Sequence, residues 1–280
     1  MADSSTTALA ATINELWQRR SELTANDLDA VSSVVQAIEL LDTGAVRVAE
    51  PGIAGEPPVV NEWLKYAILL FFRLSAMDTV EVGPLEYVDK IPLKRDYEAR
   101  EVRVVPGASA RWGSYQAPGV VLMPSYCNIG SFVGENSMVD TWATVGSCAQ
   151  IGANVHLAGG VGIGGVLEPA EAAPVMIGDD AFIGSRCMVT SGARVGTGAV
   201  LGAGVILNSS IPVIDAETGE EISRGVVPDW SVAVFATRPR EFPGGTFGLP
   251  CALVIKRLGE GERHDKTALN DALRTHGVAL

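Results

Sequence analysis

The chain is poor in charged and in aromatic residues. Of its 280 residues, 19% are charged and 6% are aromatic, whereas soluble domains carry roughly 25% charged residues. Hydrophobic residues make up 47%, which excludes a disordered chain because disorder needs low hydrophobicity and high charge. The net charge of −12 argues against a nucleic-acid partner, because binding to a phosphate backbone needs a basic face. We therefore expect a globular protein with no nucleic-acid partner.

Long apolar runs and targeting signals are also missing. The densest apolar stretch, 67–72, lies between Lys65 and Arg73 and is far shorter than the ~18 residues of a membrane helix. The first residues, Met1-Ala2-Asp3-Ser4-Ser5, have neither the basic start nor the apolar core of a signal peptide. The sequence thus predicts no membrane partner and a cytoplasmic location.

Metal-binding spacing is absent as well. The four cysteines form no CxxC pair, and the three histidines are scattered, so no zinc motif can be recognised. Because free cysteine is among the most buried residue types, we expect buried, reduced thiols and no metal.

Residues 6–76 show a helical pattern. Thr24 and Asp27 are spaced as in a capping box, ahead of apolar residues that continue to Leu41 before Gly44. A further helix is expected from Glu62 to Leu74, after the breaker Pro57-Pro58. Residues 1–103 are therefore predicted to form an N-terminal helical and mixed domain.

The middle of the chain repeats every six residues, with a break at 166–176. The repeated positions hold aliphatic residues or cysteine, namely Val121, Cys127, Val133, Val139, Val145, Ile151, Leu157, Ile163, Ile177, Ile183, Val189, Val195, Leu201 and Leu207. Neither a helix nor an alternating strand has this period. It fits a parallel β-helix of triangular coils, in which each aliphatic residue points inward and glycine permits the turns.

We therefore predict a mainly β protein built around a left-handed parallel β-helix at 104–212, with roughly four to five coils. Left-handed coils are typical of hexapeptide repeats. Residues 213–280 are expected to form a small β/α extension, with a hairpin turn at Asp215-Ala216-Glu217-Thr218-Gly219, strands at 228–234 and 252–255, and a short helix at 266–275.

Several sequence motifs are more specific than the repeat. They are Arg103-Val104-Val105-Pro106, Leu122-Met123-Pro124-Ser125-Tyr126, Val139-Asp140-Thr141-Trp142 within 138–152, Asn154-Val155-His156-Leu157, and the segments 41–49, 159–169 and 251–256. Across nearly the whole chain, this set resembles the tetrahydrodipicolinate N-succinyltransferase family of the lysine (diaminopimelate) pathway.

The resemblance implies an acyl-CoA-dependent N-acyltransferase, with acyl-CoA as co-substrate and no permanently bound cofactor. It implies a homotrimer whose sites lie between neighbouring coils, where the amine of 2-amino-6-oxopimelate, an amino dicarboxylate, attacks the thioester. Arg103 would hold a substrate carboxylate, and Asp140 would contact the amine and help accept its proton. A backbone N–H must also stabilise the oxyanion, and Gly159, Gly160, Gly164 and Gly165 can expose such amides near the CoA.

One motif departs from the family. Met188 stands where the resemblance implies a second catalytic glutamate, and Ser191 replaces another acid nearby. Since methionine cannot accept a proton, the base would be assembled from Asp140 with Glu168 or His156, or else the donor or acceptor differs. Succinyl-CoA is the default donor, and acetyl-CoA in a tabtoxin-like secondary pathway is the alternative.

The candidate residues also have structural interpretations. Asp140 fits a solvated turn, His156 a structural hydrogen bond and Arg103 a surface ion pair. Arg73 and Lys256 either bind the substrate or the CoA phosphates, or they simply face solvent. Trp142 either lines the pantetheine channel or covers a corner of the coil. We expect the 166–176 loop to be a lid over a neighbouring subunit's site.

Two other functional classes compete with the acyltransferase interpretation. One is a zinc-dependent γ-type carbonic anhydrase, which needs three histidines, and the other is an inactive scaffold.

Overall fold

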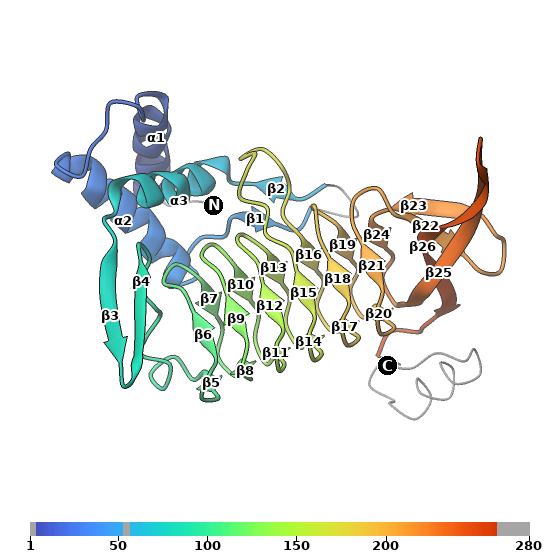
Figure 1. The fold of residues 1–280 in the computed structure, drawn as a ribbon. Coiled ribbons are helices and arrows are strands. Elements are labelled where there is room, and N and C mark those ends of the chain that lie inside the picture. Colours follow the sequence, from blue (N-terminus) through green and yellow to red (C-terminus); the bar gives the residue numbers. More distant parts are fainter. Residues whose placement is uncertain (1–3, 53–56, 262–280) are drawn as a thin grey trace.

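The structure is a computed structural model that describes residues 4–52 and 57–261. Three helices, α1 (Ser4–Gln18), α2 (Leu28–Asp42) and α3 (Glu62–Leu74), pack together at the N-terminal end of the stack of coils (Figure 1). Their buried faces share one apolar core. Within the described part of the chain, no helix is long and apolar enough to span a membrane.

The predicted helix after Thr24 begins later than a capping box would place it. Asp27, not Thr24, is the N-cap residue of α2, and its side chain does not cap the helix. Instead, its carboxylate accepts hydrogen bonds from the N–H (2.7 Å) and hydroxyl (3.0 Å) of Thr24. The motif therefore closes the turn before the helix. The predicted helix at Glu62–Leu74 is confirmed.

Three faces of parallel two-residue strands form the prism (Figure 1). The β5 face contains β5 (Arg103–Val104), β8 (Val121–Leu122), β11 (Met138–Val139), β14 (His156–Leu157), β17 (Phe182–Ile183) and β20 (Val200–Leu201). The β6 face contains β6 (Ser109–Ala110), β9 (Tyr126–Cys127), β12 (Thr144–Val145), β15 (Gly162–Ile163), β18 (Met188–Val189) and β21 (Ile206–Leu207). The β7 face contains β7 (Tyr115–Gln116), β10 (Phe132–Val133), β13 (Gln150–Ile151), β16 (Met176–Ile177), β19 (Arg194–Val195) and β24 (Val226–Val227). The predicted left-handed parallel β-helix is confirmed.

The second residue of nearly every strand is an aliphatic that points into a continuous core. The predicted inward position of Val121 is wrong. Leu122 is fully buried and pairs with Val139, whereas Val121 lies on the outside. The link from Leu122 to Cys127 is five residues, one fewer than the regular six, so the repeat changes phase there.

The predicted number of four to five coils is too low, because each face contains six parallel strands of the stack. The repeat begins at Arg103, before the phase change that conceals its first coil. The domain boundaries at 103/104 and 212/213 stay a prediction.

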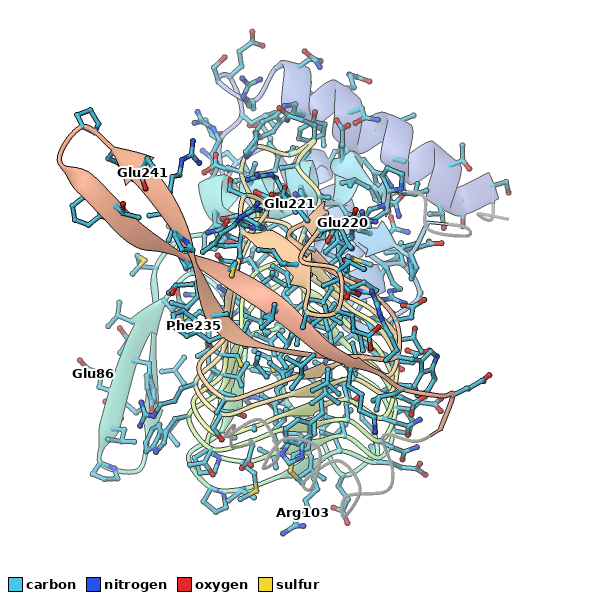
Figure 2. The ribbon with its side chains drawn as sticks, turned by 90° about the vertical axis from the view of Figure 1, so that its right-hand side faces the viewer. Glu86, Arg103, Glu220, Glu221, Phe235 and Glu241 are labelled. Atoms are coloured by element: carbon cyan, nitrogen blue, oxygen red, sulfur yellow. The ribbon has the colours of Figure 1, made fainter. Side chains whose placement is uncertain are left out.

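Beyond the coils, β22 (Pro212–Asp215) and β23 (Glu221–Arg224) form the predicted hairpin. The strands predicted at 228–234 and 252–255 are longer than expected. They belong to β25 (Ser231–Phe242) and β26 (Gly245–Arg257), an antiparallel pair that extends the β5 face and projects past the prism (Figure 2). The helix expected at 266–275 lies outside the described residues.

Two further segments flank the prism, a strap beside one face and a hairpin at the first coil. The strap, residues 45–52 with β1 (Ala49–Glu50) and β2 (Val59–Val60), runs beside the β7 face. Arg47 contacts this face through Gln150 (3.0 Å) and the Phe132 ring (3.9 Å). Pro51 and Pro58 border a cavity over its last coils. The hairpin of β3 (Asp78–Val82) and β4 (Leu85–Asp89) precedes the first coil.

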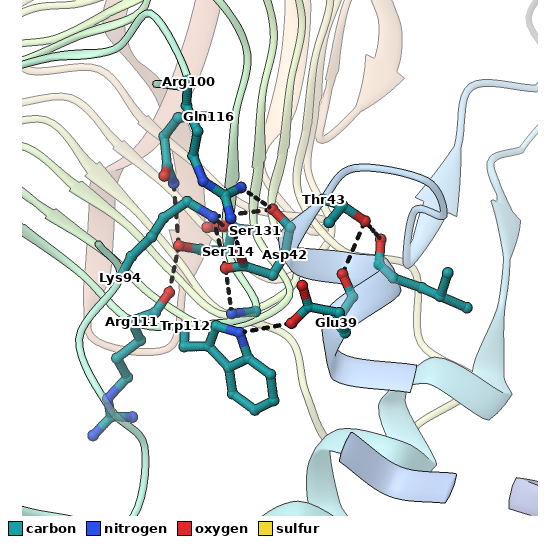
Figure 3. A network of polar contacts seen from close by, with 12 residues as sticks. Glu39, Asp42, Thr43, Lys94, Arg100, Arg111, Trp112, Ser114, Gln116 and Ser131 are labelled. Atoms are coloured by element: carbon teal, nitrogen blue, oxygen red, sulfur yellow. Dashed lines mark hydrogen bonds and ion pairs between the residues drawn. The ribbon is translucent and has the colours of Figure 1, made fainter. Parts of the chain in front are cut away.

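A buried ion cluster joins the helices to the first coil (Figure 3). Asp42, at the end of α2, accepts hydrogen bonds from Lys94 Nζ (2.6 Å), Arg100 Nη2 (2.8 Å) and the Gly113 N–H (2.9 Å). Both Asp42 and Lys94 are buried. Two cations and a backbone donor thus satisfy one buried carboxylate, the arrangement that a buried charge requires.

Candidate active site

Three of the predicted site residues occupy one column on the outer side of the β5 face. Arg103 is the first outward residue of the column, His156 lies three strands further, and Lys256 on β26 lies four strands beyond it. With strands about 4.8 Å apart, the column runs along the whole stack. Figure 2 shows Arg103 pointing away from the coils.

Asp140 and His156 come together beside this column. Asp140 follows β11, His156 opens β14, and these strands are neighbours. The Oδ2 of Asp140 lies 3.3 Å from the Nε2 of His156. Their side chains are 30% and 37% exposed, so both are accessible to a small molecule. The structure therefore brings together two of the three predicted catalytic residues.

Thr141 fixes the carboxylate of this pair. Its N–H donates to Asp140 Oδ1 at 2.6 Å, and its hydroxyl lies 3.2 Å from the same oxygen. Partial burial would raise the pKa of Asp140, but the hydrogen bonds from the Thr141 N–H, His156 and the Thr141 hydroxyl outweigh it and lower that pKa. Asp140 is thus an anion at neutral pH and a fixed hydrogen-bond acceptor.

Phe182 limits the orientation of the histidine ring. It is the next residue of the column, and its ring meets that of His156 edge to face at 5.2 Å between centroids. Sequence reasoning missed Thr141 and Phe182. Thr141 is adjacent to Asp140 in the sequence, but no local pattern indicates that its N–H and hydroxyl both meet the carboxylate.

The corner after β11 carries Trp142, a residue that is 77% exposed and whose backbone is left-handed (φ 62°). In the next coil, Gly159 and Gly160 occupy this corner. The Gly160 N–H donates to Thr141 O at 2.8 Å, and the Gly164 N–H donates to Val189 O at 2.8 Å. These two predicted oxyanion donors are therefore engaged within the coils.

Of the four glycine amides, Gly159 and Gly165 remain available. Among residues 4–52 and 57–261, no acceptor pairs with either N–H. Gly165 lies after β15, near the 166–176 loop at a different corner. Gly159 is thus the available glycine amide at the same corner of the prism as Asp140.

Other predicted residues lie elsewhere in the chain. Glu168, in the 166–176 loop, borders a hollow of about 470 Å³ with Ser191 and Ser209, at the corner between the β6 and β7 faces. Arg73, at the end of α3, donates to the Ser21 carbonyl at 3.0 Å. Neither residue joins the Asp140 pair within one chain.

Met188 lies on the outer side of the β6 face and is 43% exposed. Its thioether covers Gly162, because a Cβ built on Gly162 would lie 2.5 Å from the sulfur. Across the described ranges, no group of three or more His, Cys, Asp or Glu side chains could hold a metal ion.

Two family models match the chain. One describes the N-terminal part of tetrahydrodipicolinate N-succinyltransferase and matches residues 8–74, and the other describes the hexapeptide repeat of succinyl-transferase and matches 174–209. A solved structure assigned as a 2,3,4,5-tetrahydropyridine-2-carboxylate N-succinyltransferase from Campylobacter jejuni has a similar fold. It has a TM-score of 0.54 and 19% identity, covering 80% of this chain and 62% of that one.

Full-length relatives are closer in sequence. The 2,3,4,5-tetrahydropyridine-2,6-dicarboxylate N-succinyltransferase of Paramagnetospirillum magneticum is 48% identical over 278 residues, which cover 95% of this chain and 98% of the relative. The enzyme of the same name from Acinetobacter baylyi is 47% identical over 274 residues, with the same two coverages. The chain therefore belongs to the tetrahydropyridine-2,6-dicarboxylate N-succinyltransferase family, as its motifs indicate.

Proposed function

We propose that this chain transfers a succinyl group from succinyl-CoA to the amine of tetrahydropyridine-2,6-dicarboxylate in its open form, 2-amino-6-oxopimelate. The Asp140–His156 pair carries the proposal, because an exposed, fixed anion beside an imidazole suits the capture and deprotonation of an amine. Family membership supplies the class of reaction, a CoA-dependent acyl transfer.

The transfer takes place directly in a ternary complex. The ammonium group first loses a proton, and the amine lone pair then attacks the thioester carbonyl to form a C–N bond. The tetrahedral intermediate loses a second proton from nitrogen as the C–S bond breaks and the CoA thiolate leaves. Protonation of that thiolate gives the amide, CoA and one net proton.

Within the pair, Asp140 accepts a hydrogen bond from the substrate amine and His156 takes up the proton. The lowered pKa of Asp140 suits it to hold a cation and makes it a weak base at neutral pH. His156 shares the Asp140 carboxylate and has a ring fixed by Phe182. Asp140 therefore orients both the amine and the imidazole.

The other predicted residues keep supporting roles in this proposal. The Gly159 N–H stabilises the oxyanion, and the planar fork of Arg103 holds an acceptor carboxylate. Trp142 lines the channel for the pantetheine arm. Lys256, half-buried at the far end of the column, attracts the CoA phosphates.

We also propose a homotrimer. The outer side of the β6 face exposes Met188 (43%) and Ile206 (47%), and apolar surface of this kind is typical of subunit contacts. A neighbouring chain would bring its 166–176 loop, with Glu168, to the Asp140 corner. Light scattering should give about three times 29.3 kDa, and a monomeric mass would contradict the trimer. Cytoplasmic location stays a prediction.

Acetyl-CoA is the second candidate donor, since the apolar Met188 stands where the family resemblance implies a glutamate. The deciding experiment measures CoA release with succinyl-CoA and with acetyl-CoA on the same acceptor. We expect a kcat/KM at least about tenfold higher for succinyl-CoA. The reverse preference would identify an acetyltransferase. No turnover with either donor would contradict the acceptor assignment, and no binding of either donor by calorimetry would favour an inactive scaffold.

A further inference from the structure

Arg186 stands at the same corner of the prism as Asp140, two coils further along. It follows β17 and has a left-handed backbone (φ 59°), as do Trp142 (φ 62°) and Gly160 (φ 71°). The Gly160 N–H donates to Thr141 O at 2.8 Å, and the Arg186 N–H donates to Gly159 O at 3.0 Å. Trp142, Gly160 and Arg186 therefore hold equivalent positions in three successive coils.

In the middle coil, glycines hold the two corner positions that Thr141 and Trp142 hold in the coil before it. A Cβ built on Gly159 would meet nothing closer than Thr141 O at 3.6 Å. A Cβ on Gly160 would lie 3.3 Å from the Cγ of Arg186, so the stem of Arg186 lies over Gly160. We call the space bounded by Asp140, Trp142, Gly159, Gly160 and Arg186 the corner notch. Two strand spacings make it about 10 Å high.

The guanidinium of Arg186 is an unpaired charge in a charge-poor stack. Residues 104–212 contain three arginines. The other two have interaction partners: Arg111 pairs with Asp89 at 2.8 Å, and Arg194 is likewise not free. In the described part of the chain, no carboxylate lies within ion-pair distance of Arg186, and its side chain is exposed. An unpaired planar fork of this kind is suited to bind a carboxylate.

The two arginines bracket the candidate active site. Arg103 on β5 lies two coils before β11, and Arg186 lies two coils after it. With the acceptor's amine at Asp140 and the donor's thioester over Gly159, the reacting pair would have a guanidinium on each side. Both reactants of the proposed function carry carboxylates, the donor at the end of its succinyl group and the acceptor at both ends.

We propose that Arg186 binds a carboxylate of the reacting pair in the corner notch and thereby determines specificity. This inference rests on the proposed function. The chemistry is the same whether the carboxylate belongs to the succinyl group or to the acceptor, and kinetics can separate these two sources.

The test compares Arg186→Gln with the unaltered enzyme, using succinyl-CoA and acetyl-CoA on the same acceptor. A hydrogen bond to a charged group contributes enough that its loss lowers kcat/KM about tenfold or more. If the carboxylate is the donor's, kcat/KM falls for succinyl-CoA alone and the donor preference shrinks. If it is the acceptor's, the acceptor KM rises about tenfold with both donors. Values within twofold of the unaltered enzyme for both reactants would overturn the proposal.

Two further variants make the test specific. Arg186→Lys keeps the charge without the planar fork and should recover only part of the loss. Arg95→Gln removes an exposed arginine that lies before the first coil and should leave all constants unchanged. An equal loss in Arg95→Gln would show an effect of net charge and overturn the assignment. If the unaltered enzyme itself uses neither donor, the proposed function fails, a result distinct from an active enzyme indifferent to Arg186.

Discussion

The side chain of Asp140 is held as an anion mainly by hydrogen bonds from Thr141, the residue that follows it. The N–H of Thr141 reaches one carboxylate oxygen and His156 reaches the other, so both oxygens are held on a strand end that has little freedom to move. A carboxylate fixed in this way offers a substrate ammonium a preorganised partner.

Replacing this carboxylate should abolish most turnover. In Asp140→Asn, the amine loses its anionic partner and the imidazole its orienting group, so we expect kcat to fall roughly 10²- to 10⁴-fold. The KM for acyl-CoA should stay within twofold, because the side chain contacts the acceptor. Initial rates of CoA release measure both constants, and a kcat close to that of the unaltered enzyme would remove Asp140 from the mechanism.

The lowered pKa of Asp140 also predicts a pH dependence. The ionised carboxylate is the active form, so activity that depends on it is lost only as pH falls through a pKa below the ordinary 3.8. The profile of kcat/KM should therefore show no acid limb from Asp140 above about pH 4. An acid limb at higher pH that vanished only in Asp140→Asn would contradict this assignment.

The cysteines should be chemically inert. All four are free and buried, as predicted, and burial raises the pKa of Cys127 and of Cys148 to about 12. Because the thiolate is the reactive form, the folded protein should react with a thiol reagent only after denaturant is added. Rapid modification of one or more thiols in native buffer would show that this burial is not maintained.

At the scale of the element, the repeat itself could be predicted from the sequence. Val139 and Leu157 lie eighteen residues apart, one coil, so the period already implies that Asp140 and His156 come from neighbouring strands. Glu168 could not be placed in this way, because its loop interrupts the period. The first coil was missed for a related reason, since the short link after Leu122 changes the phase.

Glycines at the turns permit close approach between coils, and this can be tested at one position. A Cβ on Gly134 would lie 2.5 Å from the backbone carbonyl carbon of Gly152 in the next coil. Gly134→Ala should therefore lower the free energy of unfolding by about 1–3 kcal/mol, measured by urea denaturation at fixed protein concentration. Gly159→Ala is the matched control and should leave stability nearly unchanged. Equal stability of the two variants would contradict the steric argument.

For the whole molecule, the cluster around Asp42 connects the helices with the stack. Asp42→Asn would leave Lys94 and Arg100 without their carboxylate in a buried position, and breaking such a cluster should reduce the free energy of unfolding by about 3–5 kcal/mol. Chemical denaturation measures the loss. The surface pair Arg19–Glu15, at 3.9 Å, provides the control, because Glu15→Gln should change stability by less than about 1 kcal/mol. Similar values for both variants would show that the cluster contributes no more than a surface pair.

The cluster itself was not predictable from the sequence. Asp42 lies far in the sequence from Lys94, Arg100 and Gly113, and no local pattern relates it to them. Their meeting depends on how the helices dock on the first coil, which is a property of tertiary packing.

The strap has a consequence for how the stack comes apart. In a linear array of coils, each coil contacts only its neighbours, so the end coils can open independently of the rest. Through Arg47, the strap touches Gln150 and Phe132 in the earlier coils, and its Pro51 and Gly52 border a cavity together with Arg194 and Val226 of the last coils. Opening the far end of the array therefore also disturbs a segment anchored near its beginning. We expect this coupling to make a repetitive solenoid unfold in a single cooperative transition.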